Sequence, residues 1–177
     1  MRAVMALSGG MDSTALLMRL LADGYTVSCL SYNYGQKHVI ELERAKANIE
    51  YLAMNGYEVQ HEITDLSSAM GIFHSALTTD DLEVPEGHYE EEQMKQTVVP
   101  NRNAIFSSIL YGYALSIALR ENTNVIIALG VHSGDHAIYP DCRPEFYEAI
   151  SMAFEVGNWD SEKVNFHLPY IDGDKES

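Results

Sequence analysis

The chain has 177 residues, the length of one domain, and its 46% hydrophobic and 21% charged residues exclude a disordered or fibrous protein. Its net charge of −15 would repel phosphate backbones, so we expect no nucleic-acid partner. The sequence has no apolar run near the roughly 18 residues that span a bilayer and no secretory signal pattern, so we expect no membrane partner and a cytoplasmic location.

Apolar runs and periodicities predict strands and helices that alternate along the chain. In chain order, these are a strand at residues 2–7, a helix at 12–22, a strand at 25–32, a helix at 39–54, a strand at 57–63, a helix at 103–120, a strand at 124–129, a helix at 145–154 and a strand at 164–168. Such alternation is typical of βαβ units. We therefore predict an α/β fold with an open five-stranded parallel sheet and helices on both faces, of the Rossmann-like kind.

Helical spacing indicates which side chains of the first two helices face the core. In the first helix they are Leu16, Leu17, Leu20 and Leu21. In the second helix we expect Ile40, Ala47, Tyr51 and Met54. Cys29, in the second predicted strand, is expected to be a small buried residue.

One stretch, at about residues 65–100, fits no βαβ unit. Its middle, residues 80–92, contains seven acidic residues and neither Lys nor Arg. Such a segment is either a solvated loop or a lid over an active site, because long loops in compact domains often have that role. We predict a single domain over residues 1–177 that carries this acidic insertion or lid.

A glycine-rich hexapeptide, SGGMDS at residues 8–13, joins the first predicted strand to the first helix. Glycines let the backbone approach a ligand closely, and the free N–H groups at a helix N-terminus attract anions. The hexapeptide lacks the spacer and lysine of a Walker A loop. It is either a phosphate-binding loop or a turn in which Ser8 or Asp12 caps the helix.

The hexapeptide resembles the PP-loop of ATP pyrophosphatases, which split ATP between its α- and β-phosphates. Three later segments, YGQKH at residues 34–38, VPNRN at 99–103 and GVHSGDHAIYPDCR at 130–143, resemble the 7-cyano-7-deazaguanine synthase family of queuosine precursor synthesis. The resemblance covers essentially the whole chain and implies a fold of the adenine-nucleotide alpha-hydrolase type. It also implies an ATP-dependent C–N ligase that converts 7-carboxy-7-deazaguanine and ammonia to the nitrile through adenylated acid and amide intermediates, releasing AMP and pyrophosphate.

The resemblance further implies which residues form the site. ATP would be bound by Leu7, Ser8, Gly9, Gly10, Met11, Asp12, Ser13, Thr14 and Lys37. The deazaguanine would be bound by Tyr34, Gln36, His38, Asn103, Asp135, Tyr139, Asp141 and Arg143. Catalytic roles would fall to Asp12, Arg102 and Lys175, and a magnesium ion would touch Asp12.

Some of these residues also have ordinary structural interpretations. The planar fork of Arg102 suits a phosphate or carboxylate, or a surface salt bridge. Lys37 would reach the polyphosphate or remain solvated. Asp135 and Asp141 would accept hydrogen bonds from an amino-pyrimidinone edge or cap their own loop.

The chain departs from the family at its C-terminus. Family members continue beyond the position of Lys175 into a helix and a four-cysteine zinc cluster, whereas this sequence has only Cys29 and Cys142. We therefore expect no zinc here and a shortened C-terminus, as a fragment, a natural short form or a trimmed core. The resemblance implies a homodimer. Two alternatives stay open, namely another PP-loop adenylating enzyme, for tRNA thiolation or amide synthesis, and a non-catalytic nucleotide- or deazaguanine-binding module.

Overall fold

The computed structural model describes residues 1–35, 39–73, 99–131 and 139–169. Its centre is a parallel five-stranded sheet in the order β3-β2-β1-β4-β5. The strands are β1 (Arg2–Ala6), β2 (Thr26–Asn33), β3 (Gln60–Asp65), β4 (Val125–Ala128) and β5 (Val164–His167). The chain moves from β1 toward one edge through β2 and β3, then returns to the other side of β1 with β4. The carboxyl end of β1 is therefore the topological switch point, where open α/β sheets bind ligands.

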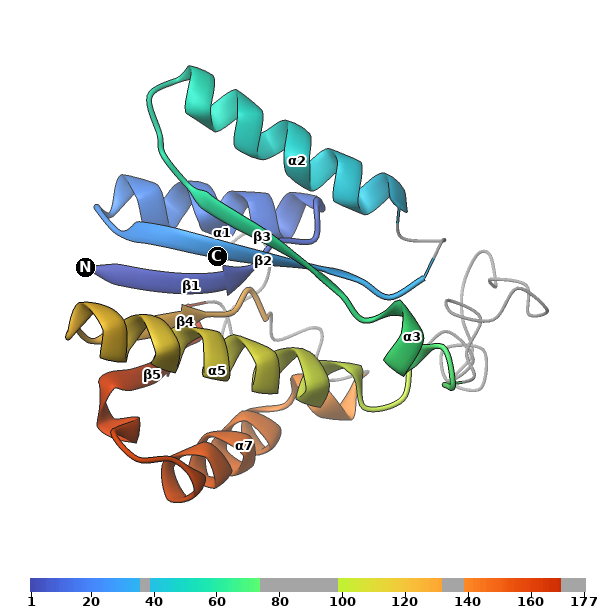
Figure 1. The fold of residues 1–177 in the computed structure, drawn as a ribbon, viewed down its shortest axis with the longest axis vertical. Helices are drawn as coiled ribbons and strands as arrows, with labels where there is room; N and C mark the ends of the chain where they lie inside the picture. The colour runs from blue at the N-terminus through green and yellow to red at the C-terminus, as the bar shows by residue number, and fades with distance from the viewer. Residues whose placement is uncertain (36–38, 74–98, 132–138, 170–177) are drawn as a thin grey trace.

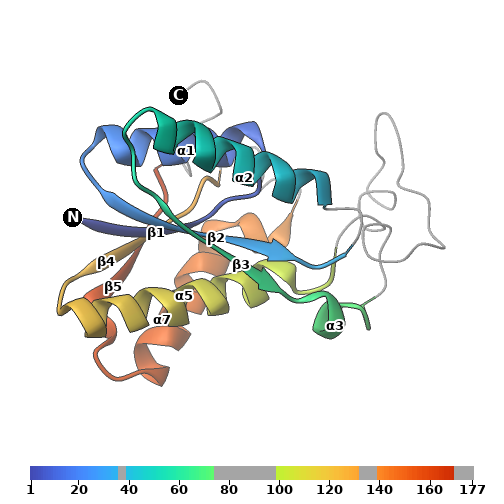
Figure 2. The ribbon, with the colours of Figure 1, turned by 45° about the horizontal axis from the view of Figure 1, so that its top comes forward.

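Helices cover both faces of the sheet, as the sequence predicts (Figure 1). The helices α1 (Met11–Ala22) and α2 (Val39–Met54) lie on one face, and α5 (Arg102–Glu121) and α7 (Pro144–Gly157) lie on the other (Figure 2). The shorter elements are α3 (Ser67–Met70), η2 (Pro140–Cys142) and η3 (Ser161–Lys163). Among the described residues, no helix is both long enough and apolar enough to cross a membrane.

Each face of the sheet has its own hydrophobic core, because side chains alternate between the faces along a strand. On β1, Ala3 and Met5 pack with the leucines of α1, whereas Val4 packs with α5. Leu16, Leu17 and Leu20 are buried, Leu21 packs against them while partly buried, and Cys29 is fully buried. Burial raises the pKa of the Cys29 thiol to about 12. These inward-facing predictions are confirmed.

The inner face predicted for α2 is wrong. Ile40, Tyr51 and Met54 are exposed by 65%, 65% and 87%, and Ala47 is exposed as well. The buried residues of this helix are Ala45 and Leu52. The helix buries only a narrow stripe of its surface. Ala45 lies on that stripe, where the backbone of Gly9 packs against it. An apolar period alone does not reveal such a backbone contact.

The predicted strands and main helices are all present, and their bounds differ most, by three residues, at the start of β3 and at the end of α7. This strand begins at Gln60 rather than at residue 57. The residue at 57, Tyr57, still belongs to the turn that ends α2, where its N–H donates to the Leu52 carbonyl. Gly56 adopts a φ of +88° in that turn. The turn that ends α2 therefore includes Tyr57, although a tyrosine side chain favours a strand.

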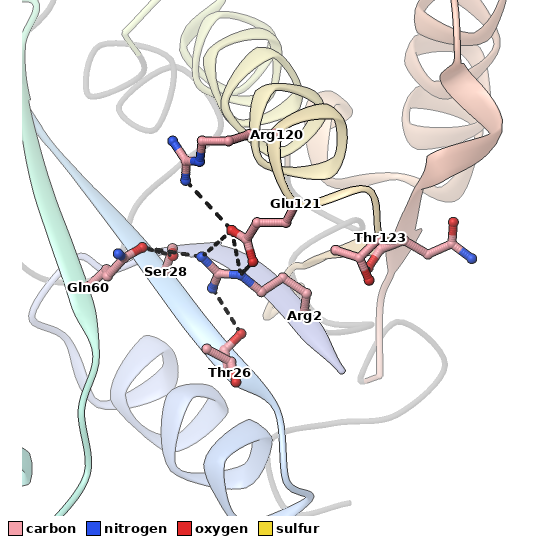
Figure 3. A network of polar contacts seen from close by, with 8 residues as sticks. Arg2, Thr26, Ser28, Gln60, Arg120, Glu121 and Thr123 are labelled. Carbon is pink, nitrogen blue, oxygen red and sulfur yellow. Dashed lines mark hydrogen bonds and ion pairs between the residues drawn. The ribbon is translucent and has the colours of Figure 1, made fainter.

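A buried arginine closes the amino edge of the sheet (Figure 3). The Arg2 side chain is 8% exposed, and its Nε lies 3.2 Å from a Glu121 carboxylate oxygen at the end of α5. Its other nitrogens donate to the Thr26 carbonyl and to Oε1 of Gln60, each at 3.2 Å. Ser28 donates to the same Gln60 oxygen at 2.8 Å. The hydrogen bond from Arg2 holds the pKa of Glu121 below its usual range.

This network predicts unequal effects for two arginines that contact the same carboxylate. We expect Arg2→Met to lower the free energy of unfolding by about 1–3 kcal/mol, because it removes donors to three groups at once. Arg120 is 66% exposed and lies 3.6 Å from Glu121, so Arg120→Met should change stability by less than about 0.5 kcal/mol. Urea unfolding followed by circular dichroism measures both values. Equal losses would contradict this role for Arg2.

Candidate functional site

The loop at residues 8–13 folds back on itself through two serines. The Ser8 N–H donates to Oγ of Ser13 at 3.2 Å, and the two hydroxyl oxygens lie 3.0 Å apart. The Gly10 N–H donates to the Ser8 hydroxyl at 3.2 Å. This arrangement gives the loop a fixed shape at the carboxyl end of β1 before any ligand binds.

The first turn of α1 directly follows this loop. Its N-cap is Gly10, with φ −77° and ψ 167°, and no side-chain hydrogen bond caps the helix. The N-cap is thus a glycine rather than Ser8 or Asp12. Asp12 is the acidic residue of the first turn and is half-buried. Backbone N–H groups at such an uncapped helix start are suited to a phosphate group.

Helix α2 packs directly against the loop. Gly9 has a φ of +82°, and a Cβ atom added there would overlap the Glu41 carbonyl oxygen and lie 3.0 Å from the Ala45 nitrogen. The two helices are also joined by side chains, since Asn48 of α2 donates to the Thr14 hydroxyl, which donates to the Gly10 carbonyl, each at 2.9 Å. Only glycine fits at position 9, both for its φ and for its surroundings.

A cavity of about 340 Å³ lies beside the loop. Its walls are formed by Ala6, Leu7, Ser8, Tyr32, Tyr34, Glu41, Leu42, Arg102, Asn103 and Phe106. The Tyr32 and Phe106 rings are stacked, with centroids 3.9 Å apart, and Tyr32 also donates to the Phe106 carbonyl at 3.0 Å. This volume is within the range of small-molecule sites. Aromatic side chains and a few polar groups thus surround a space next to the phosphate loop.

Arg102 brings a positive charge to this cavity. The residue before it, Asn101, adopts a left-handed conformation with φ 60°, and α5 begins at Arg102 itself. The Arg102 guanidinium donates to the Tyr34 hydroxyl at 3.4 Å. Burial raises the pKa of Tyr34, and the charge of Arg102 partly opposes that shift. The tyrosine is therefore a neutral hydroxyl that holds one edge of the guanidinium.

Asn103 links the cavity to the segment at residues 139–143. Its side-chain nitrogen donates to the Asp141 carbonyl at 3.3 Å and lies 3.6 Å from the Cys142 sulfur. Tyr139 and Asp141 are half-buried, whereas Arg143 is exposed. These three residues lie near the site, but they are not among the described residues that line the cavity.

The structure thus brings together five of the residues that the sequence implies for the site, namely Leu7, Ser8, Tyr34, Arg102 and Asn103. Gly9, Gly10, Met11, Asp12, Ser13 and Thr14 form the adjoining loop and helix start. Gln36, Lys37, His38, Asp135 and Lys175 lie outside the described residues, as does the acidic segment 74–98.

The sequence patterns did not identify five residues of the cavity wall. These are Ala6, Tyr32, Glu41, Leu42 and Phe106. The sequence spacing of two of them could have placed them at the site. Tyr32 is two residues from Tyr34, the spacing of side chains on one face of a strand, and Phe106 lies one helical turn after Arg102. Within the described ranges, no group of three or more His, Cys, Asp or Glu side chains is placed to hold a metal ion.

An open parallel sheet with a glycine-rich loop at its switch point defines an α/β protein of the Rossmann-like fold class. The fold is shared with a solved structure described as a predicted subunit of tRNA methyltransferase from Methanocaldococcus jannaschii. That structure matches with a TM-score of 0.57 and 15% identity over 99% of this chain and 71% of the other.

The particular family follows from the sequence. The model of the family described as queuosine biosynthesis protein QueC matches residues 2–177, and the chain belongs to this family. It is 46% identical to the 7-cyano-7-deazaguanine synthase of Hahella chejuensis over 96% of this chain and 68% of that protein. It is also 46% identical to the enzyme of the same name from Caldicellulosiruptor saccharolyticus, over 99% of this chain and 73% of that one. The predicted family is confirmed.

The close approach of α2 predicts how two glycine substitutions will differ. Gly9 and Gly56 both have positive φ, but a Cβ at Gly56 would meet nothing within 4 Å. We expect Gly56→Ala to cost about 1 kcal/mol, from backbone strain alone. Gly9→Ala should cost more and should slow ATP-dependent pyrophosphate release at least about tenfold, because α2 must move away from the loop. Thermal unfolding and a pyrophosphate assay measure these effects, and equal behaviour of the two variants would contradict this contact.

Proposed function

We propose that this chain converts 7-carboxy-7-deazaguanine and ammonia to 7-cyano-7-deazaguanine, using ATP and releasing AMP and pyrophosphate. Family membership and the printed names of its relatives support this reaction. The observation that carries it is the position of the SGGMDS loop against a cavity that also contains Arg102 and Tyr34. A nucleotide phosphate and a planar acid would meet there.

The chemistry explains why such a site needs ATP. A carboxylate is a poor electrophile, because its leaving group would be oxide. Attack of a carboxylate oxygen on the α-phosphorus releases pyrophosphate and gives an acyl adenylate, from which ammonia displaces AMP to form the amide. Attack of the amide oxygen on a second ATP, with loss of one of the two nitrogen-bound protons, releases a second pyrophosphate and gives an imidate adenylate. Loss of AMP and the remaining nitrogen-bound proton then gives the nitrile.

The residues of the loop and of α5 would supply positioning and charge stabilisation. The uncapped N–H groups of α1 would hold the polyphosphate that leaves as pyrophosphate. The Arg102 guanidinium would face the negative charge that develops where the carboxylate and the α-phosphate meet. None of these roles requires a covalent bond to the protein.

The described residues at this point include a carboxylate that suits magnesium. Magnesium in phosphoryl sites is held by one or two carboxylates together with the phosphates of the substrate. Asp12, in the first turn of α1 next to the loop, fits that requirement. A magnesium ion held by Asp12 would supply neutralisation of the phosphate charge when bound.

The cavity would receive the deazaguanine. Its stacked Tyr32 and Phe106 and the adjoining Tyr34 form an aromatic wall that suits a planar heterocycle. Asn103 would contribute the polar contact at the wall, near Asp141, Tyr139 and Arg143. The roles assigned to Gln36, Lys37, His38, Asp135 and Lys175 remain proposals, as do the homodimer, the cytoplasmic location and the lid.

This function predicts the identity and the ratio of the products. With ATP, ammonia and 7-carboxy-7-deazaguanine, we expect two AMP and two pyrophosphate for each nitrile, because each of the two activation steps cleaves ATP at the α-phosphorus. Ion-exchange chromatography of the nucleotides and mass spectrometry of the heterocycle measure this ratio. A reaction that yields ADP and phosphate would contradict the proposed function.

A further inference from the structure

Hydrogen bonds hold both polar groups of the peptide between Leu7 and Ser8 and also the N–H of the peptide before it. The Leu7 N–H donates to the Leu30 carbonyl of β2 at 2.8 Å. The Leu7 carbonyl accepts from the hydroxyl of Ser31 at 2.5 Å, and the Ser8 N–H donates to Ser13 at 3.2 Å. This peptide therefore cannot rotate without breaking a hydrogen bond.

Ser31 contacts the loop at the point where the sheet stops pairing. In the register of the two strands, Ala6 lies opposite Leu30 and is the last residue of β1 in the ladder. Beyond it, the chain turns into the loop, and the side chain of Ser31 takes over the bond to the Leu7 carbonyl. Ser31 is 1% exposed, so water does not replace its hydroxyl if the hydrogen bond is lost.

The Ser31 hydroxyl is itself held by a histidine of β3. Its Oγ lies 2.7 Å from Nε2 of His61. A serine hydroxyl has one proton, and the Leu7 carbonyl can only accept it. Ser31 must therefore accept from His61, which requires a proton on Nε2. Burial and the charge of Lys46 lower the pKa of His61, so near pH 7 the ring is neutral and carries that one proton.

We propose that Ser31 and His61 are positioning residues for ATP. Their relay crosses from β3 through β2 to the Leu7 carbonyl, and it sets the orientation of the peptide whose N–H faces Ser13 in the phosphate loop. The proposal rests on the proposed function in one respect, namely that this loop binds the polyphosphate. Neither residue lines the cavity among the described wall residues, so each acts through the loop backbone.

The same strand provides a matched control. Ser28 is also fully buried on β2, and its hydroxyl donates to a β3 side chain, Gln60, at 2.8 Å. It lies at the amino end of the strand pair, beside Arg2 rather than beside the loop. A Ser28→Ala variant thus removes a similar buried hydroxyl without touching Leu7.

The test is calorimetric titration of the chain and its variants with MgATP, without the carboxylic acid. We expect Ser31→Ala and His61→Leu to raise the Kd for ATP about five- to tenfold, because the loop peptide is no longer fixed. His61→Gln, whose amide can donate from a similar position, should stay close to the wild type. Ser28→Ala should lower the Tm about as much as Ser31→Ala does and leave the Kd unchanged.

Several results would overturn the proposal. An unchanged Kd in Ser31→Ala, or an equal rise in Ser28→Ala, would show that the relay does not act on the loop. If Ser31→Ala does not fold, the comparison of His61→Leu with His61→Gln decides. Nitrogen-15 NMR of the wild type provides an independent readout, and an Nε2 atom without a proton would contradict the relay. Absence of ATP binding by the wild type would overturn the proposed function and this inference with it.

Discussion

The contact of Gly9 with the backbone of α2 is the constraint on which the rest of the site depends. Because a Cβ at this position would overlap the Glu41 carbonyl, the loop and the first turns of α2 are held at backbone distance. That distance explains why a small residue, Ala45, occupies the buried position of α2 beside the loop. It also places Glu41 and Leu42 in the cavity wall, close to the end of β1.

The two edges of the sheet have opposite roles. At the amino edge, the Arg2 guanidinium donates hydrogen bonds to oxygen atoms of β2, β3 and α5. At the carboxyl edge, the serine and histidine hydrogen bonds fix the backbone, while the N-cap of α1 is a glycine. The amino edge therefore contributes to the stability of the fold. The carboxyl edge presents the backbone N–H groups of the α1 start to a phosphate, as expected at a switch point.

The sequence predicted the sheet, its helices and the phosphate loop, because apolar periodicity and glycine placement are local signals. It failed where the determining contact is between segments distant in the chain. The inner face of α2 was assigned from its apolar residues, whereas the part of it near the loop is set by the backbone of Gly9. Tyr32 and Phe106 were missed because their stacking joins β2 to α5, which are far apart in the chain. The relay through Ser31 and His61 joins two strands to the phosphate loop and has no sequence pattern.

The central claim is that the acid attacks the α-phosphorus of ATP held at this loop. The most direct measurement uses 7-carboxy-7-deazaguanine labelled with oxygen-18 in both carboxylate oxygens. The acid adenylate loses one labelled oxygen to AMP, and the amide keeps the other until the second activation. We therefore expect each AMP to carry one oxygen-18 atom and pyrophosphate to carry none. Unlabelled AMP, or label in pyrophosphate or inorganic phosphate, would contradict it.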